Sequence, residues 1–191
     1  MSEGSKSTPD RLPPAVGETF ALWKQKLRDS IPQLTNGSGP LLMPTLEMPS
    51  DWLDYNGHVT ENRYLQLCSI ATDNLLRYIG VDGEHLSTTG SYYTVETHLF
   101  HLGELHAGDY VQVLTQLLGA DEKRLHVFHV ITREGSEGPA ATGEQMLIHV
   151  GARSGRSAPV QGKVRERLLE LARLHAELSR PERAGASIRL R

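Results

Sequence analysis

The chain has 191 residues, of which 38% are hydrophobic, and a formal net charge of −3 at pH 7. This length suits one domain with extensions better than two domains, and the charge gives no reason to expect a nucleic-acid partner. The single cysteine, Cys68, excludes an intramolecular disulfide framework and a cysteine-based zinc site. Because there is no apolar signal region and no run near the ~18 residues of a membrane span, we expect a soluble, cytoplasmic protein without a membrane partner.

Residues 1–40 form a predicted N-terminal extension with one amphipathic helix over residues 16–31. The helix is indicated by apolar residues at helical spacing, namely Val16, Phe20, Trp23, Leu27 and Ile31. Residues 35–40 have the Gly, Ser and Asn content of a linker. Residues 41–48 are typical of a short strand, which Pro44 makes irregular or places at an edge.

The clearest predicted element is a long helix that begins after Gly57. Its apolar stripe is continuous and ends before Gly80, a natural C-terminal stop; it consists of Tyr64, Leu67, Cys68, Ala71, Leu75 and Ile79. Thr60 or Asn56 could cap its start. We expect this helix to be buried at the centre of the fold, with Cys68 as a small core residue.

Four alternating segments follow the helix, over residues 91–102, 110–118, 124–133 and 140–151. Short turns between consecutive strands predict an antiparallel meander. A C-terminal helix, marked by Val164, Leu168, Leu171, His175 and Leu178, and a basic tail complete residues 153–191. Because the long helix must bury its stripe on the sheet, we predict an α+β fold over residues 41–152. An antiparallel sheet wraps around a central helix, with extra N- and C-terminal helices.

The most informative stretch places Asp54 just before the tight turn Asn56-Gly57 that enters the central helix. A carboxylate there can attack an activated carbonyl or deprotonate the water that does. The backbone N–H groups of Gly57, His58 and Val59 would hold the carbonyl oxygen, helped by the helix dipole. The structural alternative is that Asp54 makes only an Asx turn, and spacing alone favours that alternative.

Residues 54–59, entering a helix that carries Tyr64-Leu65, resemble the hotdog-fold acyl-CoA thioesterases of the hydroxybenzoyl-CoA thioesterase type. Gly108-Asp109 before a strand and residues 141–144 support the resemblance, which covers roughly residues 42–150. It implies that Asp54 is the catalytic base or nucleophile. It also implies a homodimer or homotetramer with shared sites, and no cofactor other than the coenzyme A of the substrate. Thr60 and Ser69-Ile70 depart from the residues usual in the family.

The run from residue 52 to residue 95, including the segment 90–98, further resembles the thioesterases of carnitine breakdown, which act on betainyl-CoA, alone or fused to a carnitine dehydrogenase. Aromatic rings bind quaternary ammonium groups with ~0.5–2 kcal/mol each, and the candidate rings here are Trp52, Tyr55 and Tyr92. Glu96 is a candidate second carboxylate that would suit a cationic substrate. Tyr93, in line with Val95, is expected to be a packing residue.

The remaining candidates have two interpretations each. The His58 ring is either a general acid or a turn residue, and Asn56 either orients Asp54 and water or only forms the turn. Lys123, Arg124 and Arg156 flank strand ends, where they could bind the phosphates of coenzyme A, although basic turn residues are usually only solvated.

No metal is predicted from histidine spacing. His126 and His129 are three apart on a strand and so face opposite sides, as do His98 and His101. No pair has the i, i+4 helical spacing of zinc sites.

The sequence thus predicts an acyl-CoA thioesterase for a small acyl group. One alternative is a hotdog-fold enoyl-CoA hydratase, although enzymes of that kind carry Asp and His five positions apart, and Asp54 and His58 are four apart. The other alternative is a non-catalytic acyl-CoA-binding module, against which the intact turn-and-helix motif argues.

Overall fold

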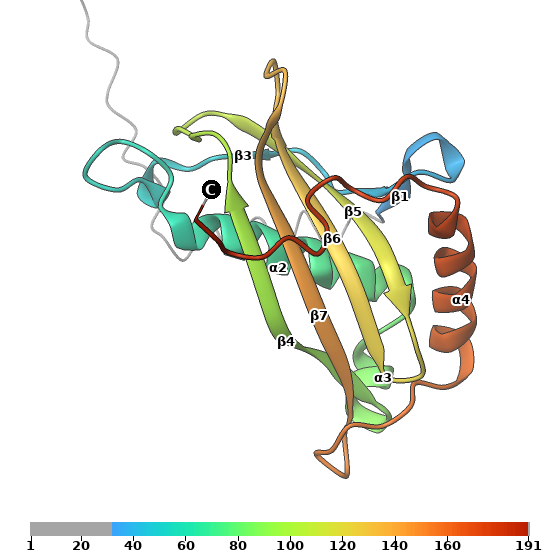
Figure 1. The fold of residues 1–191 in the computed structure, drawn as a ribbon. Coiled ribbons are helices and arrows are strands. Elements are labelled where there is room, and N and C mark those ends of the chain that lie inside the picture. The colour runs from blue at the N-terminus through green and yellow to red at the C-terminus, as the bar shows by residue number, and fades with distance from the viewer. Residues whose placement is uncertain (1–31, 191) are drawn as a thin grey trace, which may run out of the picture.

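The structure, a computed structural model, describes residues 32–190 (Figure 1). The helix predicted over residues 16–31 lies outside the described residues. The helices are α2 (Glu61–Tyr78), α3 (Gly83–Thr88) and α4 (Gly162–Ala176), with 3-10 turns η1 (Thr35–Gly37) and η2 (Ser50–Trp52). The strands are β1 (Gln33–Leu34), β2 (Leu41–Leu42), β3 (Leu46–Glu47), β4 (Gly90–His101), β5 (Tyr110–Ala120), β6 (Arg124–Arg133) and β7 (Pro139–Gly151).

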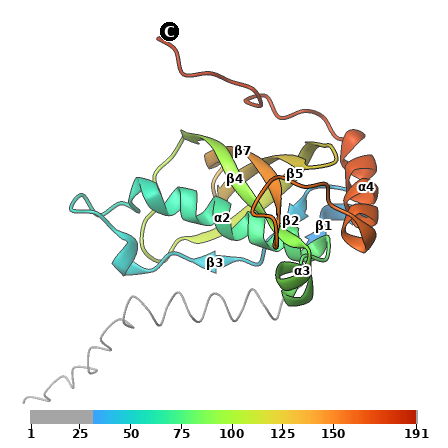
Figure 2. The same cartoon turned by 90° about the horizontal axis from the view of Figure 1, so that it is seen from below.

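The strands form one antiparallel sheet in the order β1-β2-β5-β6-β7-β4, with β3 also paired to β5. The four predicted strands are confirmed to within two residues at each end. The predicted meander holds only for β5, β6 and β7, because β4 pairs with β7 at the far edge of the sheet and not with β5. The sheet curves around α2, which lies along one of its faces (Figures 1 and 2). An antiparallel sheet wrapped around a long helix confirms the predicted α+β hotdog fold.

The central helix α2 is buried along the predicted stripe, with Leu67 and Cys68 fully inaccessible to solvent. Gly80, at a φ of 96°, terminates the helix as expected. The helix approaches β7 closely at Gly143, where a side-chain methyl would collide with Sγ of Cys68. Burial raises the pKa of the Cys68 thiol to about 12, so this cysteine is an uncharged core residue, as the sequence predicts.

The segment before α2 is more ordered than a linker. Residues 33–42 form a hairpin, in which the backbone N–H of Thr35 donates to the carbonyl of Pro40 at 3.0 Å. Its second strand pairs with β5, so the predicted domain boundary at residue 40 falls inside this hairpin. The chain leaves the β5 edge around Pro44 and rejoins it at β3, which matches the expected irregular strand.

The C-terminal helix α4 packs against β5 and the end of α2, where Val164, Leu168 and Leu171 join the core. His175 fixes this contact, because its Nδ1 accepts from the backbone N–H of Leu117 at 2.8 Å. Beyond α4 the tail crosses the face of the sheet opposite α2 (Figure 1). There the backbone N–H of Gly185 donates to Glu144 at 2.8 Å.

Strand β4 is one edge of the sheet. The side of β4 on which Tyr93 lies corrects the prediction that this residue packs in the core. Tyr92 points into the core, whereas Tyr93 and Val95 are 58% and 60% exposed. Tyr93 is therefore not a packing residue within this chain, because no further strand or helix of the described part covers that side of β4. Within residues 32–190 no helix has the length and apolar character needed to cross a membrane.

Candidate active site

The Asp54 turn closes on itself through backbone hydrogen bonds. The N–H of Asp54 donates to the carbonyl of His58 at 2.8 Å, and the N–H of Gly57 donates back to the carbonyl of Asp54 at 3.1 Å. Gly57 has a φ of 80°, a left-handed conformation that glycine adopts without steric cost. Leu53 and Val59 form an isolated bridge at the base of the turn. The turn therefore holds Asp54 at a fixed place before α2.

The Asp54 carboxylate is held in the turn by hydrogen bonds to one of its oxygens. Its Oδ1 accepts from the backbone N–H of Asn56 at 2.8 Å and from that of His58 at 3.2 Å. The hydrogen bond from His58, followed by that from Asn56, lowers the pKa of this carboxyl group despite the opposing effect of desolvation. No hydrogen bond within the described residues reaches Oδ2, and the Asn56 side chain adds to the lowering of the pKa of this carboxyl group. Asp54 thus presents an ionised oxygen at the surface, in the Asx turn that the sequence offered as the structural alternative.

The three amides predicted to hold the carbonyl oxygen are engaged within the chain, which corrects that expectation. The N–H of Gly57 donates to Asp54, that of His58 donates to the Asp54 carboxylate, and that of Val59 donates to the carbonyl of Leu105 at 2.8 Å. These N–H groups are used by the hydrogen bonds that close the turn and hold it against the β4–β5 loop. The free donors lie just after these residues in the sequence. They are the N–H groups of Glu61 and Asn62, which have no partner within residues 32–190.

These two amides open α2, where an uncapped helix leaves its first N–H groups unsatisfied. Thr60 occupies the N-cap position, but its hydroxyl donates to Oδ1 of Asn62 at 2.6 Å and caps no backbone N–H. The partial positive charge of the helix start adds to the two free donors. The first turn of α2 can therefore receive an oxygen that develops negative charge.

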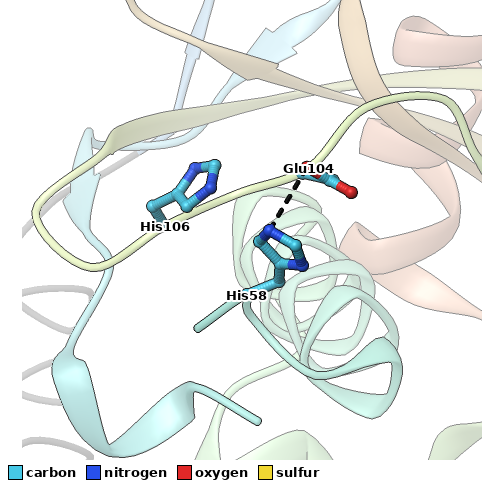
Figure 3. Close-up of side chains that lie close together, drawn as sticks. All are labelled: His58, Glu104 and His106. Atoms are coloured by element: carbon cyan, nitrogen blue, oxygen red, sulfur yellow. Dashed lines mark ion pairs between the residues drawn. The ribbon is translucent and has the colours of Figure 1, made fainter. Parts of the chain in front are cut away.

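The loop between β4 and β5 lies against the Asp54 turn and contains residues that sequence analysis missed. The hydroxyl of Tyr64 donates to the carbonyl of Gly103 at 3.2 Å and accepts from the N–H of Leu105 at 3.0 Å. This contact brings Glu104 to 3.3 Å from Nε2 of His58. His106 lies beside them, as Figure 3 shows. No local pattern links residues this far apart in the sequence.

Of the candidate rings, only Tyr55 lies free beside Asp54, and it is 97% exposed. Trp52 is 3% exposed in the core, and the guanidinium of Arg63 already lies 4.9 Å from its ring centroid. A ring that is buried and occupied by a cation of the same chain offers no open face to a substrate. The prediction that Trp52 binds an ammonium group is therefore wrong for this conformation.

Tyr92 and Glu96 lie away from Asp54 within one chain. The β4–β5 loop beside Asp54 follows His101, and Tyr92 lies nine steps along the strand from His101, about 30 Å at ~3.3 Å per residue. Tyr92 is buried, with its ring 5.1 Å from that of His149. Glu96 is exposed on β4 and lines a cavity of about 580 Å³ together with His126, Glu144 and tail residues 185–188.

The three predicted coenzyme A contacts cluster at the opposite end of the sheet from Asp54. Lys123 lies in the turn after β5 and Arg124 begins β6, where it forms an ion pair of 2.6 Å with Asp121. Arg156 is adjacent, since its carbonyl accepts from Gly151 and the carbonyl of Lys123 accepts from His149. The structure brings these basic residues together but not to the Asp54 of the same chain.

A family model described as the Thioesterase-like superfamily matches residues 48–168, which is more than half of the chain. The chain belongs to the thioesterase-like superfamily. A betainyl-CoA thioesterase of Pseudomonas aeruginosa is 43% identical over 152 residues, covering 78% of this chain and 96% of that protein. An L-carnitine dehydrogenase/betainyl-CoA thioesterase of Rhizobium meliloti is 44% identical over 80% of this chain. This chain spans only 31% of that longer relative.

Two solved structures share the fold. A putative thioesterase from Pseudomonas putida is 36% identical, with a TM-score of 0.69, over 80% of this chain and 97% of that one. A Staphylococcus aureus protein solved in complex with CoA is 25% identical, with a TM-score of 0.70, over 85% of this chain and 98% of that one.

Proposed function

We propose that this chain is an acyl-CoA thioesterase, which converts a small acyl-CoA and water into a free acid and the thiol of coenzyme A. Two observations carry the proposal: the ionised Asp54 in the turn that leads into α2, and the unpaired amides of Glu61 and Asn62 in the first turn of that helix. The family assignment and the relatives named as thioesterases support the same reaction.

The chemistry needs a group that attacks and a site that receives charge. The Asp54 carboxylate attacks the thioester carbon, or takes a proton from the water that attacks it. The carbonyl oxygen then gains negative charge, which the first-turn amides of α2 stabilise. Collapse of the intermediate expels the thiolate of coenzyme A, which takes up a proton. When Asp54 is the nucleophile, water hydrolyses the resulting anhydride in a second step.

The acyl group that we favour is betainyl, which carries a quaternary ammonium. Relatives of more than 40% identity are named for betainyl-CoA. Exposed Tyr55 beside Asp54 offers an aromatic face for the cation, and the Glu104 carboxylate next to His58 adds negative charge to the same surface. A cationic acyl group therefore fits this site better than a long apolar chain.

A homodimer built on β4 explains why the basic cluster lies far from Asp54. Five consecutive residues of this edge strand, 93–97, are exposed, and an exposed edge strand readily pairs with another strand. Antiparallel pairing of two β4 strands about a two-fold axis brings the 121–124 turn of one copy toward the Asp54 end of the other. The coenzyme A bound at the site of one protomer would then contact the basic residues of the other, namely Lys123, Arg124 and Arg156.

Thiol release from purified protein tests the reaction. The substrates are betainyl-, acetyl-, aromatic and long-chain acyl-CoA, and the variants are Asp54→Asn and, as a matched control, Glu47→Gln, an exposed carboxylate on β3. We expect the fastest release from betainyl-CoA and a loss of about 10²–10⁴-fold in Asp54→Asn only.

Each other outcome revises a defined part of the proposal. Release from a different thioester, still lost in Asp54→Asn, keeps the reaction and discards the betainyl assignment. Full activity in Asp54→Asn removes Asp54 from the mechanism. Absence of release from all four thioesters rejects the thioesterase proposal.

A further inference from the structure

Three side chains next to the Asp54 turn carry the donor atoms of a metal site. One ring nitrogen of His58, one ring nitrogen of His106 and one carboxylate oxygen of Glu104 all lie within 4.8 Å of one another. Figure 3 shows the two rings and the carboxylate gathered between the turn and the β4–β5 loop. Two imidazoles and a carboxylate are ligands that suit zinc and neighbouring divalent metals.

The spacing of these atoms is close to that of a tetrahedral site. Ligand atoms about 2.1 Å from a tetrahedral zinc ion are about 3.4 Å from each other. Nε2 of His58 and Oε2 of Glu104 are 3.3 Å apart, which already matches that value. The rings of His58 and His106 meet edge to face, with centroids 5.0 Å apart. A shift of about one ångström in the partly exposed His106 side chain would complete a three-ligand set with an open fourth position.

The backbone that carries the three residues is anchored on both sides. Oδ2 of Asp109 accepts from the backbone N–H of His106 at 2.8 Å, and it also lies 3.6 Å from the guanidinium of Arg133. Glu104 lies between Gly103 and Leu105, which both bond to the Tyr64 hydroxyl. The ligands therefore need to lose only side-chain freedom to bind an ion, which lowers the entropic cost of binding.

We propose that His58, Glu104 and His106 form a binding site for a divalent cation of the zinc class. Histidine spacing within a single helix or strand predicts no metal. Here the ligands come from a turn and a distant loop. Binding would tie the Asp54 turn to the β4–β5 loop through the His58 ring, one residue after Gly57. This proposal does not depend on the thioesterase reaction.

Titration of the metal-free protein with Co²⁺ tests the site, because tetrahedral Co²⁺ absorbs visible light and can then be displaced by Zn²⁺. The variants are Glu104→Gln and His106→Ala, each of which removes one proposed ligand. The matched control is His98→Ala, since His98 lies on β4 outside the cluster. We expect one Co²⁺ bound per chain. The affinity should be at least about 10-fold weaker in Glu104→Gln and in His106→Ala, and unchanged in the control.

Two results would overturn the proposal. One is the absence of any Co²⁺ or Zn²⁺ binding by the wild-type protein at equal chain and metal concentrations. The other is binding that persists undiminished in both Glu104→Gln and His106→Ala. Thermal unfolding in the presence of a chelator establishes that the variants are folded, because these partly exposed side chains contribute little to the metal-free fold.

Discussion

The backbone N–H of His58 donates to Oδ1 of Asp54 at 3.2 Å, and this bond is the largest cause of the lowered pKa of that carboxyl group. A lowered pKa means that Asp54 is ionised throughout the neutral and mildly acidic range. We therefore expect kcat/KM to show no acid limb due to Asp54 between about pH 5 and 8. A pH–rate profile of the free enzyme measures this, and an acid limb in that range that moves to higher pH in Asp54→Glu would contradict it.

The His58 side chain is predicted to matter less than its backbone. Its N–H holds Asp54, whereas its ring points to Glu104 at 3.3 Å. His58→Ala keeps the N–H and removes only the ring, so we expect less than about a 10-fold loss in kcat, well below the contribution typical of a general acid. A loss as large as that of Asp54→Asn would instead place the ring in the chemistry. Steady-state kinetics of the two variants compares them directly.

The contact between Gly143 and Cys68 gives a prediction about stability. Gly143→Ala would place its methyl group against Sγ of Cys68 in the fully buried core. We expect a loss of about 1–3 kcal/mol in the free energy of unfolding, typical of overpacking. In a Cys68→Ala background the nearest remaining atom is the β-carbon, at 3.6 Å from the added methyl. The double variant should then be less destabilised than the sum of the single variants, as denaturant unfolding would measure.

The pH dependence of stability should depend on His129, which is fully buried. Burial lowers its pKa from 6.5 to about 4. The ring is neutral in the fold, with Nδ1 at 2.9 Å from the Thr115 hydroxyl and Nε2 at 3.0 Å from that of Thr72. Below 6.5 the unfolded chain binds the proton first, so stability falls as pH decreases toward 4. The loss then levels off, at on the order of 3 kcal/mol.

Thermal unfolding at a series of pH values measures this dependence. His129→Gln removes the titrating ring and should flatten the curve between about pH 6.5 and 4. The matched control is His101→Gln, because His101 is exposed at the end of β4 and should leave the dependence as it is. An unchanged curve in His129→Gln would assign the effect to other groups.

Local patterns predicted most of the fold and part of the site. Helical spacing located α2, alternation located β4 to β7, and the glycine turn located Asp54. The amides were assigned incorrectly, because the partner of the Val59 N–H is the carbonyl of Leu105, which no local pattern reveals. Glu104 and His106 were missed for the same reason, since the Tyr64 hydroxyl brings their loop to the turn. Tyr92 and Tyr93 lie on opposite faces of β4, and alternation alone does not show which face is covered by the rest of the protein.

The exposed edge of β4 yields a final prediction, on oligomeric state and activity together. Val95 is 60% exposed in the middle of this strand, beside the bulge between Thr94 and Glu96. Val95→Lys places a charge where two β4 strands would pair, which opposes edge-to-edge association. Leu169→Lys is the matched control, because Leu169 is 54% exposed on α4, away from that edge.

We expect a homodimer for the wild-type protein and the control, and a monomer for Val95→Lys, by sedimentation or light scattering. Because the basic cluster of one protomer would serve the Asp54 of the other, the monomer should also lose coenzyme A binding. A folded monomer with full affinity and activity would show that each chain carries a complete site.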